Sequence, residues 1–173
     1  MLSRIAESLF SIGRYVERAD GTARIVDAAR LQMLEETGQS EEITARVILQ
    51  VIMGLDPGEA PVSYATVCDR LVFDDEHSSS IAGAWRDARE NARRARETVS
   101  TELWEAINTA WNRWGGFEPD QVTARQLAWV RERAALVSGI AYSRDDAKVT
   151  LRRVPDRPRS QQPRYQPSGP LTN

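Results

Sequence analysis

The sequence of 173 residues is poor in the residue types that usually carry metal or nucleophilic chemistry. Cys68 is the only cysteine, which excludes an intrachain disulfide and a cysteine metal cluster. Its apolar neighbours predict a small core residue rather than a nucleophile. His77 is the only histidine; Asp74 rather than a glutamate stands three residues before it, and no triad partner is evident. We therefore expect no metal, no cofactor and no catalytic residue.

Long apolar runs are also missing. Nothing approaches the run of about 18 apolar residues that a membrane span requires. The N-terminal segment separates its apolar residues by charges, and no small-residue cleavage site follows, so it does not have the pattern of a signal peptide. A P-loop, a dinucleotide fingerprint and a nucleophile elbow are likewise absent from the sequence. These observations predict a cytoplasmic protein with no membrane partner.

Basic residues are concentrated at the C-terminal end. Residues 152–173 carry five arginines and one acid, which leaves 18 basic and 24 acidic residues in residues 1–151. The net charge of that larger part is about −6, which argues against nucleic-acid binding. From Arg152 onward the sequence is rich in proline and arginine and has almost no apolar residues, so we predict a disordered tail over residues 148–173.

Helical periodicity dominates the remaining sequence. In the predicted first helix, residues 3–36, apolar or small side chains recur every three or four residues and form one stripe. The stripe consists of Leu2, Ile5, Leu9, Ile12, Val16, Ala19, Ala23 and Val26. Gly21 interrupts this helix at a cost of about 1 kcal/mol relative to alanine.

Further helices are predicted at 41–54, 62–73, 80–99, 101–114 and 120–141. The helix at 41–54 is expected to be strongly buried, and the segment 62–73 is assigned to a helix because no partner strand is evident. A serine of the run DDEHSSS (74–80) is expected to cap the fourth helix, whose alanine-rich stripe predicts a close approach of another helix. Short connections favour an all-α, antiparallel bundle of about five to six helices over residues 1–147.

Three stretches of the sequence follow motifs that occur together, in the same order, in one protein family. The opening run, MLSRIAESLFSIGRYVERADGTARIVD, is similar to a family start that ends in GRYVERAxxTAR. WRDARENARRARETVSTELWEAIN (85–108) and VRERAALVSGIA with SRDDA (130–147) are similar to later parts of the family, in the same order. The three stretches resemble the alpha-E domain family, a bacterial all-helical family. The resemblance covers most of residues 1–147 and implies an all-helical domain.

The resemblance also suggests that the domain is incomplete. Family members continue after SRDDA into a second copy of the GRxLERAxxTAR pattern, whereas this sequence changes near Lys148 to a proline-arginine pattern. We therefore expect a truncated alpha-E domain that contains its N-terminal half. Truncation of a bundle exposes apolar surface, which predicts a homodimer or a poorly behaved monomer.

Charged residues of the family motifs form the candidate polar cluster. Its members are Glu7, Arg14, Glu17, Arg18 and Arg24, with Glu90 and Asn91 of the second motif. On a helical wheel Glu17 and Arg24 lie about 20° apart on one flank of the first helix. One interpretation is a site that binds a carboxylate or phosphate. The other, which we favour, is a network of ion pairs that holds helices in register.

The resemblance implies a functional context rather than a reaction. Alpha-E domains are typically encoded beside, or fused to, a circularly permuted ATP-grasp protein, often with a transglutaminase-like protein nearby. We therefore expect a non-catalytic accessory or interaction partner of an ATP-grasp system that forms peptide or amide bonds. One alternative is half of an enzyme that acts on peptide-like substrates through its glutamate-arginine cluster. Another is a truncated gene product without function.

Overall fold

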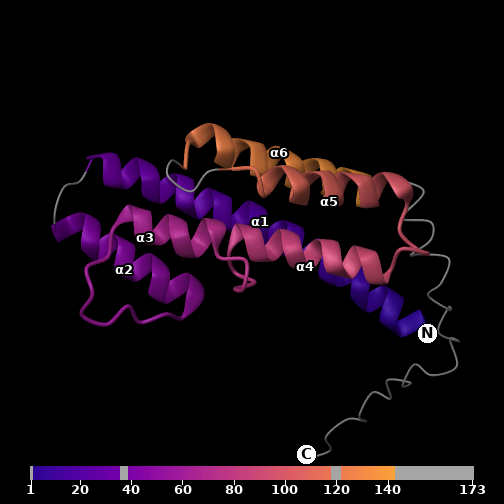
Figure 1. The fold of residues 1–173 in the computed structure, drawn as a ribbon, viewed down its shortest axis with the longest axis horizontal. Coiled ribbons are helices and arrows are strands. Elements are labelled where there is room, and N and C mark those ends of the chain that lie inside the picture. Colours follow the sequence, from indigo (N-terminus) through magenta and orange to yellow (C-terminus); the bar gives the residue numbers. More distant parts are fainter. Residues whose placement is uncertain (1, 36–38, 118–121, 143–173) are drawn as a thin grey trace, which may run out of the picture.

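A computed structural model describes residues 2–35, 39–117 and 122–142 of the chain (Figure 1). These residues form six α-helices and one short π-helix, and they contain no β-strand. The helices are α1 (Leu2–Glu35), α2 (Gln39–Met53), α3 (Tyr64–Cys68), η1 (Asp69–Phe73), α4 (Ile81–Arg94), α5 (Thr101–Trp114) and α6 (Ala124–Ala141). The predicted all-α fold class is confirmed, and the segment predicted at 62–73 is indeed helical.

The long helix α1 organises the bundle. It packs chiefly against α4 and α6, and α5 packs against both α4 and α6. Figure 1 shows α2 and α3 at one end of the molecule, beside the C-terminal half of α1. The helices α4, α5 and α6 follow one another in alternating directions, as the short connections predict.

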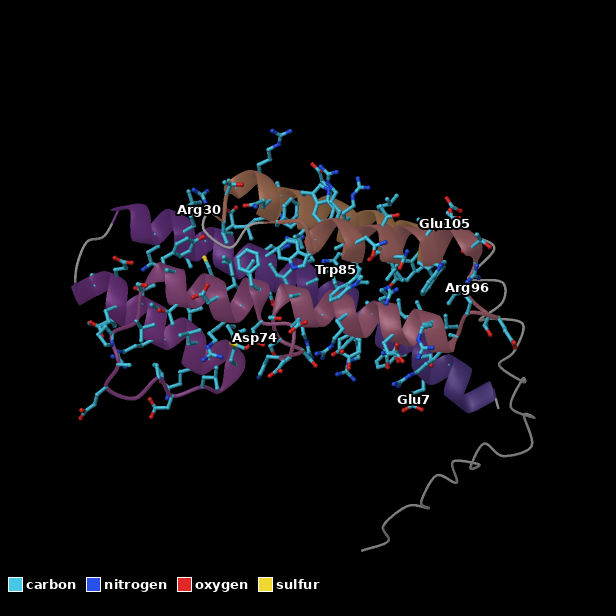
Figure 2. The ribbon with its side chains drawn as sticks, in the orientation of Figure 1. Glu7, Arg30, Asp74, Trp85, Arg96 and Glu105 are labelled. Atoms are coloured by element: carbon cyan, nitrogen blue, oxygen red, sulfur yellow. The ribbon has the colours of Figure 1, made fainter. Side chains whose placement is uncertain are left out.

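The core of the bundle lies between the stripes of α1 and α4. The stripe predicted for α1 is buried from Ile12 through Val26, and its members pack with the small residues of α4. The buried alanines are Ala19 and Ala23 of α1 and Ala84, Ala88 and Ala92 of α4. Side chains that end at Cβ let two helices approach closely, so the predicted alanine seam is confirmed. Trp85, fully buried, fills the middle of the bundle (Figure 2).

Two hydroxyl groups fix the start of α4 against α1. The Ser80 side chain caps α4 by accepting the N–H of Gly83 at 2.9 Å, and it also donates to the carbonyl of Asp74. The buried Thr22 of α1 donates from Oγ1 to the carbonyl of Ser79 at 2.9 Å. The predicted serine cap is therefore confirmed, and it is linked to α1 through the neighbouring residue.

Two helix boundaries differ from the predictions by four residues or more. The helix predicted at 80–99 ends at Arg94, where a turn begins, although Ala95 and Val99 remain buried. The apolar stripe therefore predicts which residues are buried in the core. Here the last buried residues of the stripe, Ala95 and Val99, belong to the turn after α4 rather than to the helix. The helix predicted from residue 120 begins at Ala124, because Thr123 and Gln126 form a reciprocal capping box.

The prediction that α2 is strongly buried is wrong. The buried apolar side chains of α2 are Ala45, Leu49 and Met53, whereas Ile43, Val47 and Val51 are exposed to solvent. The reason is that α2 packs on α1 and α3, which cover one side of it. The predicted disordered tail, residues 148–173, lies outside the described residues.

We predict opposite effects for alanine at two helical glycines. A Cβ at Gly83 would overlap the carbonyl oxygen of His77, so Gly83→Ala should lower the free energy of unfolding by about 2–3 kcal/mol. A Cβ at Gly21 meets no atom within 4 Å, so Gly21→Ala should raise it by up to about 1 kcal/mol. Urea unfolding of both variants measures the two changes. If the two variants changed the free energy of unfolding equally, the backbone of His77 would not lie against Gly83 at the start of α4.

Candidate functional site

A surface groove runs between α1 and α6 and has two halves, which we call the polar half and the apolar half of the α1–α6 groove. The polar half has a volume of about 600 Å³, and the apolar half has a volume of about 360 Å³. Both halves are lined by Val16, Glu17 and Ser138, so they are continuous. The groove therefore follows the contact between the helix that organises the bundle and the last described helix.

The polar half carries charges from both helices. Glu17, Asp20 and Arg24 line it from α1, and Arg131 and Glu132 line it from α6. Residues 17, 20 and 24 share one flank of α1 because they are spaced by three and four positions. Three carboxylates therefore face two guanidinium groups in this half of the groove.

Asp20 links the two walls of the polar half. Its Oδ2 accepts from Arg24 Nε at 2.8 Å within α1, and its Oδ1 lies 4.0 Å from Arg131 Nε on α6. The side chains of Arg24 and Arg131 are 62% and 43% exposed, so solvent screens these ion pairs and each contributes little to stability. This geometry weakens the interpretation that the charges serve mainly to hold the helices in register.

Glu17 and Glu132 differ from Asp20 in their surroundings. Within the described part of the chain, neither carboxylate has an ion-pair partner within 4 Å. Carboxylates accept hydrogen bonds from ammonium and guanidinium groups, and charge strengthens such bonds. The two glutamates therefore give the polar half a capacity to receive a basic group from another molecule.

The apolar half lies between the N-terminal part of α1, the end of α6 and the start of α5. Its walls include Leu9, Leu103 and Val137, with the rings of Phe10 and Tyr142 at its edge. Phe10 is 68% exposed, and the Arg14 guanidinium lies 5.9 Å from its ring centroid. Large aromatic side chains beside an apolar groove are typical of protein interaction surfaces.

The structure brings only some of the predicted cluster together. Glu17 and Arg24 share the polar half, and Arg14 joins Glu17 in the apolar half. Arg18 is not among the groove-lining residues, and its guanidinium lies 5.9 Å from the Tyr15 ring centroid. Figure 2 shows Glu7 near the N-terminal end of α1, and it does not line the groove either.

The second motif lies elsewhere, on α4. Glu90 accepts hydrogen bonds from Arg93 at 2.8 and 2.9 Å and from Arg94 at 3.1 Å, all within one helix. Asn91 Nδ2 donates to the carbonyl of Asp87 at 2.8 Å, also within α4. Neither residue lines the α1–α6 groove, so the role predicted for them remains a prediction.

Three groove residues were missed in the sequence: Asp20, Arg131 and Glu132. A signal for one of them, Glu132, exists, because the tripeptide Glu-Arg-Ala occurs at 17–19 and again at 132–134. The alanine of each copy is buried, and the glutamate of each copy lines the polar half. The repeat therefore marks equivalent positions on two helices that pack against each other.

Cys68 is buried in the core, and His77 accepts a backbone hydrogen bond in a turn. Burial raises the pKa of the Cys68 thiol to about 11, so the thiol is protonated at neutral pH, as a core residue should be. His77 accepts the N–H of Ser79 at Nδ1 in the turn before α4.

Among residues 2–35, 39–117 and 122–142, no three His, Cys, Asp or Glu side chains are grouped so as to hold a metal ion. None of the described helices is long and apolar enough to cross a membrane.

The sequence model of the Alpha-E family, described as a predicted alpha-helical domain with a conserved ER motif, matches residues 1–147. The chain contains two Glu-Arg pairs, Glu17-Arg18 on α1 and Glu132-Arg133 on α6, and the glutamate of each lines the polar half of the groove. No curated protein and no solved structure shows a significant match to the chain.

We predict that Asp20→Asn changes the free energy of unfolding by less than about 1 kcal/mol, because its arginine partners are exposed. The matched control is Asp87→Asn. Asp87 is more buried, and it accepts from Ser78 Oγ at 2.6 Å and from Arg86, so its loss should cost about 1–3 kcal/mol. Urea unfolding measures both values. A larger loss for Asp20→Asn than for Asp87→Asn would support the structural ion-pair network.

We also predict a low pKa for Glu90. The hydrogen bonds from Arg93, followed by its charge and by Arg94, lower the pKa of Glu90 to about 2. This value lies below the ordinary value of 4.5. The stabilisation that the pairing contributes is therefore fully present above about pH 4.5, and it is lost as the pH falls toward 2. Arg93→Gln should raise the pKa toward 4.5, and Arg96→Gln should leave it unchanged. Carboxyl carbon shifts followed by NMR across this pH range give the value, and an ordinary pKa in the unsubstituted chain would contradict the pairing.

Proposed function

Because the chain belongs to the Alpha-E family, we propose that it is a non-catalytic interaction module whose partner binds in the α1–α6 groove. The observation that carries the proposal is the composition of the groove. An apolar half with exposed aromatic rings adjoins a polar half with solvated charges. An apolar centre bordered by polar residues is the usual anatomy of an interface between proteins.

We propose a circularly permuted ATP-grasp protein as the partner, with a transglutaminase-like protein as a second one. This choice follows from the gene associations that the resemblance to Alpha-E proteins implies. ATP-grasp enzymes join a carboxylate to an amine, so the chain would serve a system that forms peptide or amide bonds. In the complex, Phe10 and Tyr142 would insert into an apolar site of the partner, while Glu17 and Glu132 would pair with its basic residues.

One feature favours the alternative of an enzyme, or half of one, that acts on a peptide-like substrate. Glu17 and Glu132 line opposite walls of the polar half, with Arg24 and Arg131 beside them. Carboxylates can transfer protons, and guanidinium groups can bind a substrate carboxylate. The two functions make different demands, because the module needs the groove for binding and the enzyme needs these four groups for turnover.

We predict that Phe10→Ala weakens binding of the ATP-grasp protein of the same organism by about 30-fold, as loss of an interface anchor does. Because Phe10 is mostly exposed, the variant should unfold at the same temperature as the unsubstituted chain. Leu136→Ala is the matched control, since Leu136 is an exposed residue of α6 that does not line the groove. Isothermal titration calorimetry on the full chain measures the three affinities.

Two results would count against the proposal. One is equal binding by Phe10→Ala and Leu136→Ala, which would place the interface elsewhere. The other comes from Glu17→Gln and Arg24→Gln assayed for both binding and ligase turnover in the mixture. Loss of turnover with folding and binding intact would favour the enzyme, whereas loss of binding would favour the module.

A further inference from the structure

The exposed side of α2 carries an apolar row that no described part of the chain covers. Ile43, Val47 and Val51 are 58%, 51% and 73% exposed, and they follow one another at intervals of four residues. That spacing places them in one row along the helix. Figure 1 shows α2 at the edge of the molecule, where its other side packs on α1 and α3. We call this row and its polar neighbours Ser40, Thr44 and Gln50 the α2 face.

Charged residues are absent from the α2 face, although 28% of the chain is charged. The charged residues of the described helix α2 are Glu41, Glu42 and Arg46, and all three are engaged away from this face. Glu41 accepts the backbone N–H of Tyr64 at 3.2 Å. Arg46 pairs with Glu42 at 2.7 Å, and it also donates to the carbonyls of Gly58 and Ala60 in the following loop.

The consequence of this pairing is electrostatic. The charges of α2 hold its own loop and the start of α3, so an approaching surface finds no ionic group on the α2 face to pair with its own charges. A charged partner would lose solvation there without compensation. The face therefore suits another uncharged, apolar surface, and a second copy of α2 is such a surface.

The row is also symmetric about its middle residue. Ile43 lies four residues before Val47, and Val51 lies four residues after it. In an antiparallel pair of α2 helices with Val47 at the two-fold axis, Ile43 of each copy meets Val51 of the other. Such a pairing buries the whole row in a closed, two-fold interface and brings no like charges together.

We propose that two copies of this chain form a homodimer through antiparallel packing of their α2 faces. The helix of 15 residues is roughly 22 Å long, so a single helix pair forms an interface at the small end of the usual range. The dimer should therefore dissociate at roughly micromolar concentrations. This interface is separate from the α1–α6 groove, so dimerisation and binding in the groove do not compete.

The test is sedimentation equilibrium of the full chain across the micromolar range. The unsubstituted chain should show a monomer–dimer equilibrium. Val47→Glu places two carboxylates against each other at the axis and should raise the dissociation constant at least about tenfold. Leu136→Glu adds the same charge to an exposed apolar position on α6 and should leave the constant unchanged. Circular dichroism should show the same helix content for all three proteins.

Cysteine pairs test the antiparallel arrangement. Oxidation of a mixture of Ile43→Cys and Val51→Cys chains should give a crosslinked heterodimer, whereas Ile43→Cys alone should remain uncrosslinked, because only facing positions can reach disulfide geometry. The native Cys68 is buried and should not compete. A monomeric unsubstituted chain, a dimer unaffected by Val47→Glu, or crosslinking of Ile43→Cys alone would each overturn the proposal.

Discussion

The close contact between α1 and α4 is the constraint on which the rest of the structure depends. Small buried side chains lie on both helices, Ala19 and Ala23 on α1 and Ala84, Ala88 and Ala92 on α4, and the two helices pack against each other. Larger residues would separate the helices, and the hydrogen bond from Thr22 to the carbonyl of Ser79 fixes their register. Once this pair is set, α6 packs on another side of α1, α5 joins α4 to α6, and α2 and α3 cover the C-terminal half of α1.

Both surfaces proposed to bind other molecules follow from the central position of α1. The flank of α1 that faces α6 supplies Glu17, Asp20 and Arg24 to the polar half of the groove. The helix α2 packs on α1 and α3 along one side, so its other side remains exposed. The groove combines aromatic rings with solvated charges, whereas the α2 face has no charge. This difference suits the groove to a charged partner and the α2 face to a second copy of the chain.

Much of the fold could be predicted because periodicity reports burial directly. The row from Ile12 to Val26 and the alanines of α4 are buried where the pattern places them. Periodicity does not distinguish a helix from a turn that fills the same core, so the end of α4 at Arg94 was missed. It also overstated the burial of α2, because apolar residues on several sides do not reveal how many sides have neighbours. The groove was half predicted: a wheel for α1 pairs Glu17 with Arg24, but it cannot say that Arg131 and Glu132 of α6 lie beside them.

The most direct test of the central claim is NMR mapping of the full chain as the circularly permuted ATP-grasp protein is added. If the α1–α6 groove is the binding site, backbone amide signals should shift or broaden along residues 6–24 of α1, residues 128–141 of α6 and Tyr142. The signals of residues 43–51 of α2 should keep their positions, provided that the fraction of the chain that is dimeric stays the same during the titration. Changes centred on another helix, or no changes at saturating partner, would contradict the account.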